Sequence, residues 1–239
     1  MTADTVRLLC LPHAGGTASA YHGWHTELGP DVTVVAAELP GRDGRRAEPP
    51  LTDVHRLAED LAGRLAGGTD QPYALFGHSF GAIVAFEIAR LLARDRAGQP
   101  RRLFVSASPA PDDQDIPDEP LHRLPDDQFI ARLAELGAIP RRAVDDAELS
   151  AVLLPQLRAD WTAAETYVFA PDDPLSCPIS VLGGQQDPMV GTDHLDGWRR
   201  HTTGETVVRV FPGAHFFLAD NRTLIARAVR KDLSGATGR

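Results

Sequence analysis

Short apolar runs rich in β-branched residues alternate along this chain with longer stretches whose apolar residues recur at helical spacing. This alternation is typical of a parallel β-sheet that carries helices on both faces. Strands covered on both faces form nearly continuous apolar runs. The strand candidates are residues 6–11, 32–38, 73–76, 103–106, 179–182 and 206–211. The pattern therefore predicts an α/β fold with a mostly parallel central sheet.

Two stripes of apolar residues mark helices that such a sheet needs. They consist of Val54, Leu57, Leu61 and Leu65, and of Leu218, Ile225 and Val229. A chain of 239 residues can bury one sizeable core, and α/β architectures of this length commonly form one domain. We therefore expect a single domain over residues 1–239.

The segment between the fourth and fifth predicted strands is too long for a simple crossover. About seventy residues separate these strands, whereas the connection needs only one helix. Helical stripes occur at Phe129, Ile130, Leu133 and Leu136, and again at Leu149, Leu153, Leu157 and Trp161. Pro155 interrupts the second stripe and favours a kink or a new helix start there. We predict that residues 112–169 form a helical insertion within the domain.

Composition argues against several classes of partner. The formal net charge of −9 disfavours nonspecific binding to nucleic acid or to anionic membranes, since both attract basic surfaces. No apolar run approaches the roughly 18 residues of a membrane span, and the first residues lack the basic region of a targeting signal. We expect a cytoplasmic protein. Cys10 and Cys177 lie in apolar segments and are predicted to be buried free thiols.

The segment Gly77-His78-Ser79-Phe80-Gly81 matches the nucleophile-elbow pattern G-x-S-x-G. It follows the predicted strand 73–76 and precedes an apolar helical stretch, 82–92, which is the strand-turn-helix setting that the elbow requires. A strained turn that exposes the serine leaves no room for side chains at positions 77 and 81. We predict that Ser79 is a nucleophile; the alternative is a surface turn with an idle serine.

A serine nucleophile needs a base within hydrogen-bond reach and a carboxylate that orients this base. Asp187 follows the predicted strand 179–182, and His215 follows the last predicted strand. Ser, Asp, His is the chain order of the α/β-hydrolase fold, and we therefore predict this fold for the chain. We predict that His215 is the base and Asp187 the acid. The alternatives are an Asp-Pro turn at 187–188 and a histidine at a helix start.

The oxyanion that develops on an attacked carbonyl needs hydrogen-bond donors, each worth on the order of 10²–10³ in rate. We predict the backbone N–H of Phe80, directly after the nucleophile, and that of Ala14, in the glycine-containing loop after the first strand. A flexible strand-to-helix turn is the alternative for this loop. His13 and His78 are candidates for packing beside the site or for substrate contact.

No metal or cofactor motif emerges from the sequence. His22 and His25 could share a helix face, but no carboxylate or third histidine joins them at ligand spacing. The glycine pairs form neither a phosphate loop nor a dinucleotide fingerprint. We expect neither a bound metal nor a cofactor.

Several segments together are specific for one family. They are LPHAGG at 11–16, LPGR at 39–42, GHSFGA at 77–82 with Phe86-Glu87, FVS at 104–106 followed by Ala110-Pro111, and LPQLRADW at 154–161 leading to Glu165-Thr166-Tyr167. On these motifs the chain resembles the type II (external, discrete) thioesterases that accompany polyketide and nonribosomal peptide synthetases. The resemblance covers nearly the whole chain. The family commonly has Met at the position of Phe80, which we expect to alter the shape of the acyl chamber more than the chemistry.

The resemblance implies an editing enzyme that removes stalled or wrong acyl groups from the phosphopantetheine arm of acyl or peptidyl carrier proteins. The substrate would then bring its own phosphopantetheine. The insertion 112–169 would be a helical lid over the acyl chamber, with Leu153, Leu157 and Trp161 in contact with substrate. Synthetase-fused releasing thioesterases often carry the acid after the strand that follows the nucleophile helix, but here that strand leads into Ser106-Ala107-Ser108-Pro109.

Recruitment of a carrier protein raises a conflict of charge, because carrier proteins are typically acidic and this chain is acidic as well. Arg42, Arg45 and Arg46 lie in the loop after the second predicted strand, at the carboxyl end of the sheet, and arginine suits a phosphate. We predict that they contact the phosphopantetheine phosphate or carrier carboxylates. A solvated basic loop is the alternative.

Two other functions use the same residues. A stand-alone product-releasing thioesterase or a small-molecule carboxylesterase would share the whole triad. A binding module on this fold would be expected to lack one triad member, whereas all three are present.

Overall fold

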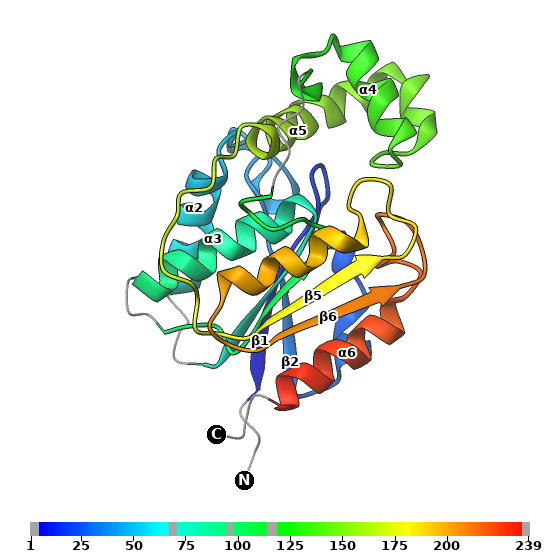
Figure 1. Ribbon diagram of the computed structural model, residues 1–239. Helices are drawn as coiled ribbons and strands as arrows, with labels where there is room; N and C mark the ends of the chain where they lie inside the picture. Colours follow the sequence, from blue (N-terminus) through cyan, green and yellow to red (C-terminus); the bar gives the residue numbers. More distant parts are fainter. Residues whose placement is uncertain (1–4, 67–70, 95–97, 114–118, 236–239) are drawn as a thin grey trace.

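Six parallel strands form one sheet in the computed structural model, which describes residues 5–66, 71–94, 98–113 and 119–235 (Figure 1). The strands are β1 (Val6–Leu11), β2 (Val32–Ala36), β3 (Tyr73–His78), β4 (Leu103–Ser106), β5 (Ile179–Gly184) and β6 (Thr206–Phe211). Their order is β2-β1-β3-β4-β5-β6, and each neighbouring pair is parallel. The predicted α/β-hydrolase fold with its parallel sheet is confirmed. The order changes direction between β1 and β3, the place where open α/β sheets bind ligands.

Three strand ends differ from the prediction. β3 and β5 each run two residues further, because Gly77 and His78 pair with β4 and Gly183 and Gly184 pair with β6. These residues lack the apolar character that marks a strand in sequence. β2 ends two residues earlier, at Ala36, where its pairing with β1 stops.

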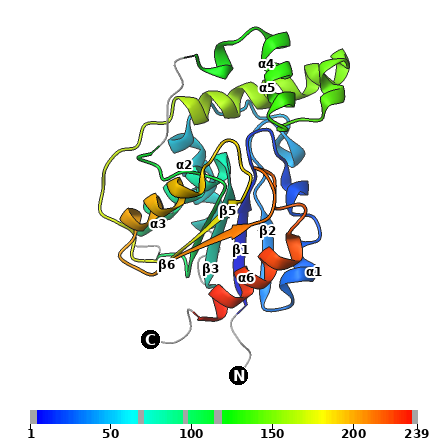
Figure 2. The same cartoon turned by 45° about the vertical axis from the view of Figure 1, so that its right-hand side comes forward.

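Helices cover both faces of the sheet (Figure 2). One face carries α2 (Val54–Ala66) and α3 (Phe80–Arg94), and the other carries α1 (Trp24–Leu28) and α6 (Arg222–Gly235). The predicted stripes face the core, with Val54, Leu57, Leu61, Ile225 and Val229 buried. Each such side chain contributes about 1.5–3 kcal/mol through burial. Leu218 precedes α6 and is half-buried, and the side chain of Leu65 lies outside the described residues.

The predicted insertion contains α4 (Asp126–Glu135) and α5 (Ala147–Glu165), which lie over the carboxyl end of the sheet (Figure 1). The two helices share a small apolar core, which includes Phe129, Leu133 and Leu157. The prediction of a new helix start at Pro155 is wrong, since α5 is continuous through it. The proline is exposed, and the helix is instead initiated by Asp146, whose side chain accepts the Leu149 N–H at 2.9 Å.

The remaining helical elements are short 3₁₀ segments in the connections. They are Ala18–Tyr21, Asp43–Arg45, Leu121–Arg123, Arg141–Val144 and Thr192–His201. Both cysteines are buried and free, as predicted, and burial raises the pKa of Cys177 to about 12. Within the four described ranges, each helix is too short or too polar to cross a membrane.

Candidate active site

Ser79 lies in the turn between β3 and α3 with a backbone φ of 55°. A positive φ is uncommon outside glycine and marks a strained, functional position. Hydrogen bonds on both sides hold the strained residue in place. Its N–H donates to Ser106 O at 2.7 Å, and its carbonyl accepts the Ala82 N–H at 2.8 Å. The side chain therefore projects above the carboxyl end of the sheet, as the sequence pattern predicts.

The two elbow glycines sit where no side chain fits. A Cβ at Gly77 would lie 2.1 Å from Gly81 O, and a Cβ at Gly81 would lie 2.3 Å from Leu11 O. Both obstacles are backbone atoms of tightly packed segments, so neither can move away as a flexible side chain could. The sharp turn at Ser79 thus depends on glycine at both positions.

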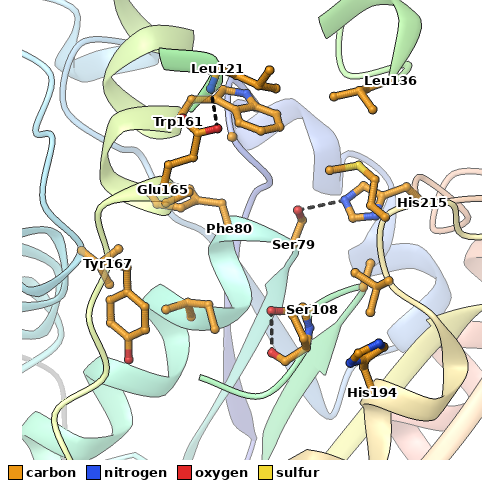
Figure 3. Close-up of a pocket in the computed structure, with 18 of the residues that line it drawn as sticks. Ser79, Phe80, Ser108, Leu121, Leu136, Trp161, Glu165, Tyr167, His194 and His215 are labelled. Carbon is orange, nitrogen blue, oxygen red and sulfur yellow. Dashed lines mark hydrogen bonds between the residues drawn. The ribbon is translucent and has the colours of Figure 1, made fainter. Parts of the chain in front are cut away.

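The structure brings Ser79, His215 and Asp187 together in one hydrogen-bonded line. Figure 3 shows the hydrogen bond between Ser79 and His215. His215 Nε2 is 2.9 Å from Ser79 Oγ, and His215 Nδ1 is 2.9 Å from Asp187 Oδ2. Asp187 Oδ1 also accepts the backbone N–H groups of Met189 and Val190, at 2.9 and 3.1 Å. An ionised Asp187 fixes the proton on Nδ1 and leaves Nε2 free to accept the serine proton.

Two further histidines lie beside His215. The rings of His78 and His215 are 5.5 Å apart, and those of His13 and His78 are 6.0 Å apart. Burial, followed by the charges of His215 and Arg42, lowers the pKa of His13 to about 4, and burial lowers the pKa of His78 well below its ordinary value. Both rings are neutral at pH 7, and neither lines the cavity. The geometry favours the packing role over substrate contact for both.

A cavity of about 520 Å³ opens over the serine, within the range of small-molecule sites. Trp161, from α5, and Leu136, just after α4, lie above Ser79, while Phe80 lies beside it and Tyr167 lies lower in the cavity (Figure 3). Trp161 therefore lines the cavity, and its contact with substrate stays a prediction.

The predicted substrate contacts at Leu153 and Leu157 are wrong. Neither lines the cavity, because both pack in the core that α4 and α5 share. Leu157 is 1% exposed and rests against Gly15. A helical stripe identifies apolar positions but does not tell which of two neighbouring apolar spaces each one fills.

The two predicted oxyanion donors border the same cavity. Phe80 is the first residue of α3, so its N–H lacks an acceptor within the helix. Ala14 lies in the loop after β1 and lines the cavity together with Ser79. The next N–H along the loop, that of Gly15, donates to Asp160 Oδ2 at 2.7 Å.

Two of the three arginines predicted to contact a carrier face inward, which corrects the prediction for them. Arg42 pairs with Asp160 at 2.6 Å, and Arg45 pairs with Asp60 at 2.6 Å and with Glu48. The side chains of Arg42 and Arg45 are 2% and 7% exposed. Arg46 is exposed and keeps the predicted role as a hypothesis.

Asp160 was not assigned a role from the sequence, although it lies in the motif LPQLRADW. Burial raises the pKa of its carboxyl, and the Arg42 contacts and the Gly15 N–H oppose that rise. The available signal was a single carboxylate among apolar positions of a helix. Such a carboxylate is seldom buried without a partner.

Comparison with known proteins identifies the family of the chain. A family model described as a thioesterase domain matches residues 6–233. The chain is 39% identical to the gramicidin S biosynthesis protein GrsT of Aneurinibacillus migulanus, over 92% of this chain and 86% of that protein. It is 43% identical to the thioesterase PikA5 of Streptomyces venezuelae, over 91% of this chain and 77% of that protein.

Solved structures give the same picture. The type II thioesterase BorB from the borrelidin biosynthetic cluster is 41% identical, with a TM-score of 0.88, over 96% of this chain and 93% of that one. The thioesterase RedJ from the prodiginine pathway of Streptomyces coelicolor is 39% identical, with a TM-score of 0.88, over 95% of this chain and 85% of that one.

Proposed function

Since the chain belongs to the thioesterase family and is a serine hydrolase that acts on thioesters, we propose that it removes stalled or wrong acyl groups from the phosphopantetheine arm of carrier proteins. The observation that carries the proposal is the line from Asp187 through His215 to Ser79, which ends in a cavity beneath helices α4 and α5. Relatives named for type II thioesterases and for antibiotic biosynthesis support it.

The first half-reaction transfers the acyl group to the enzyme. Ser79 Oγ attacks the thioester carbonyl while its proton passes to His215 Nε2, 2.9 Å away. Asp187 stabilises the imidazolium, and the N–H groups of Ala14 and Phe80 stabilise the oxyanion. Collapse of the tetrahedral intermediate breaks the C–S bond, and the phosphopantetheine leaves as a thiol with the proton from His215.

The second half-reaction frees the acid. Water attacks the Ser79 ester, His215 takes a proton from this water, and the same two N–H groups hold the oxyanion. The intermediate then releases the carboxylic acid, and the proton returns to Ser79 Oγ. A thiolate leaves more readily than an amine, so His215 has less acid work to do in the first half-reaction than in a peptidase.

The walls of the cavity suit an acyl chain. Trp161 and Leu136 above the serine, with Ile83 and Val190 among the other lining residues, present apolar surface to the group attached at the carbonyl. Closure of helices α4 and α5 over such a group would expel water from the site. We propose that this lid sets acyl preference and that the enzyme needs no cofactor of its own.

A panel of carrier proteins loaded with different acyl groups tests the function, with release of free acid as the measurement. Wild-type enzyme should clear aberrant short acyl groups faster than the matching full-length product. Preference for the full-length product would indicate product release instead. Faster turnover of simple oxygen esters than of thioesters would indicate a carboxylesterase.

A further inference from the structure

Three segments meet at one buried carboxylate, that of Asp160 in α5. Two of them, α5 and the loop after β1, border the cavity, and the third is the loop after β2. Asp160 Oδ2 accepts the Gly15 N–H at 2.7 Å and Arg42 Nη1 at 2.8 Å, and Oδ1 accepts Arg42 Nη2 at 2.6 Å. Arg42 Nη1 also donates to Gly16 O at 2.8 Å. Both charged side chains are 2% exposed. The pair therefore joins the lid helix to the loops after β1 and β2.

These bonds act on the peptide group that carries the Ala14 N–H. The Gly16 N–H donates to His13 O at 2.8 Å. In a trans peptide the C=O and the N–H point in opposite directions, so the bond at His13 O sets the direction of the Ala14 N–H. Asp160 accepts the Gly15 N–H, and Arg42 donates to the Gly16 carbonyl. Gly15 and Gly16 form the turn that positions the hydrogen bond between the Gly16 N–H and His13 O.

Helix α5 also touches this loop directly. A Cβ at Gly15 would lie 2.2 Å from Leu157 Cδ2, and Gly15 has a φ of +74°. Leu157 and Asp160 are three residues apart, so they lie on the same face of α5. A displacement of α5 therefore reaches the loop through a side-chain contact as well as through the hydrogen bonds.

We propose that Asp160, whose charge is balanced by Arg42, is a positioning residue. It acts through Gly15 and Gly16 to orient the Ala14 N–H toward the oxyanion. The inference rests on the proposed function, because it requires a tetrahedral oxyanion at the carbonyl that Ser79 attacks. Asp160 thereby couples the position of the lid to the rate of hydrolysis. When α5 packs on the loop after β1, the Ala14 N–H is in place, and when α5 moves away, hydrolysis slows.

The buried ion pair could instead serve folding alone. Two variants, one double and one single, separate a role in folding from a role in positioning. Removing one partner leaves an uncompensated buried charge, whereas replacing both partners with apolar residues often preserves stability. The double variant Arg42→Met, Asp160→Leu should therefore fold but lose the bonds to Gly15 and Gly16. Asp160→Asn retains an oxygen that can accept the Gly15 N–H and serves as the conservative variant.

The experiment uses a small acyl thioester without a carrier protein, together with two inhibitors that have the same acyl chain. One is a trifluoromethyl ketone, which Ser79 converts to a tetrahedral oxyanion, and the other is an unreactive thioether. The control is Asp232→Asn. Asp232 in α6 is a buried carboxylate that pairs with Arg209 in β6, and neither residue lines the cavity. Thermal unfolding reports the stability of every variant.

We expect the double variant to lose about 10- to 100-fold in kcat, with KM within about threefold, because a small misplacement of one donor has this effect. Affinity for the ketone should fall by a similar factor, while affinity for the thioether stays nearly constant. Asp160→Asn should recover part of kcat relative to Asp160→Ala. Asp232→Asn should lower stability and leave kcat unchanged.

A folded double variant with wild-type kcat and ketone affinity would overturn the proposal. Equal losses of ketone and thioether affinity would also overturn it, since they would indicate a general disturbance of the cavity. Failure of the proposed function would look different: the wild type would hydrolyse the small thioester but would not clear aberrant acyl groups from carrier proteins.

Discussion

The turn that holds Ser79 and the helical insertion above it, the proposed lid formed by α4 and α5, differ in what fixes their geometry. Around Ser79 the backbone fixes the geometry. A Cβ at Gly77 or Gly81 would overlap backbone atoms, and Ser79 itself has a strained φ. In the lid, α4 and α5 are held together by a small core of apolar side chains. A backbone constraint permits one arrangement, whereas apolar side chains of similar volume can replace one another. The position of the reacting atom is thus fixed, while the shape of the acyl chamber can vary.

The largest expected effect tests the fixed region directly. Ser79→Ala should lower kcat by about 10⁵- to 10⁶-fold, because the members of a triad act as a unit. Stability should change little, since the substitution removes only one half-buried hydroxyl, which bonds to His215. Steady-state hydrolysis and mass spectrometry of the acyl adduct are the measurements. An adduct on another residue of the wild type would contradict the assignment.

The next largest effect comes from the acid. Asp187→Asn should lower kcat by about 10⁴-fold, because the amide favours the wrong tautomer of His215. The matched control is Asp193→Asn, an exposed carboxylate in the neighbouring 3₁₀ segment, which should leave kcat unchanged. Retained activity in Asp187→Asn would place the acid elsewhere.

A pair of glycine substitutions tests the claim that backbone contacts fix the turn. Gly77→Ala should lower the free energy of unfolding by about 3 kcal/mol or more, because its Cβ would lie 2.1 Å from Gly81 O. Gly63→Ala, in α2 with open space around the new Cβ, should raise it by about 0.5–1 kcal/mol. Urea denaturation measures both. If Gly77→Ala were as stable as the wild type, the backbone would not be the constraint.

Two substitutions in α5 sharpen the contrast within the lid. Leu157→Ala should lower the free energy of unfolding by about 2–5 kcal/mol, since the side chain is buried in the core of the lid. Trp161→Ala, in the cavity wall, should shift the ratio of kcat/KM between long and short acyl groups by about tenfold. If Leu157→Ala instead shifted the kcat/KM ratio and Trp161→Ala instead lowered the free energy of unfolding, Leu157 would face the substrate.

Acid should destabilise the loop after β1 through His13, which is half-buried. His13 has a pKa of about 4 in the folded state against about 6.5 when unfolded, so the folded state binds fewer protons. Its contribution is fully present above pH 6.5 and is lost as the pH falls from 6.5 to 4, by up to about 3 kcal/mol. His13→Gln should flatten this dependence in urea denaturation, whereas substitution of the exposed His22 should not.

Most of the catalytic geometry was predictable because its signals are local. Ser79 lies in a compact motif, and Asp187 and His215 follow strands whose apolar character is visible in sequence. Two of the wrong predictions concern residues whose surroundings come from distant parts of the chain. The sequence indicates a surface position for Arg42, because no local signal reveals its partner Asp160, which lies 118 residues away along the chain. Leu157 was assigned to the chamber because helical periodicity does not distinguish the core of the lid from the wall of the cavity.

The insertion between β4 and β5 also has a consequence for chain entropy. These strands are adjacent in the sheet although about seventy residues separate them in sequence. The entropy of closing a loop grows only with the logarithm of its length, so this connection costs about 1 kcal/mol more than one of about twenty residues. Insertions and deletions here are therefore inexpensive for the fold. The connection can therefore be longer or shorter while the strands beneath keep their register.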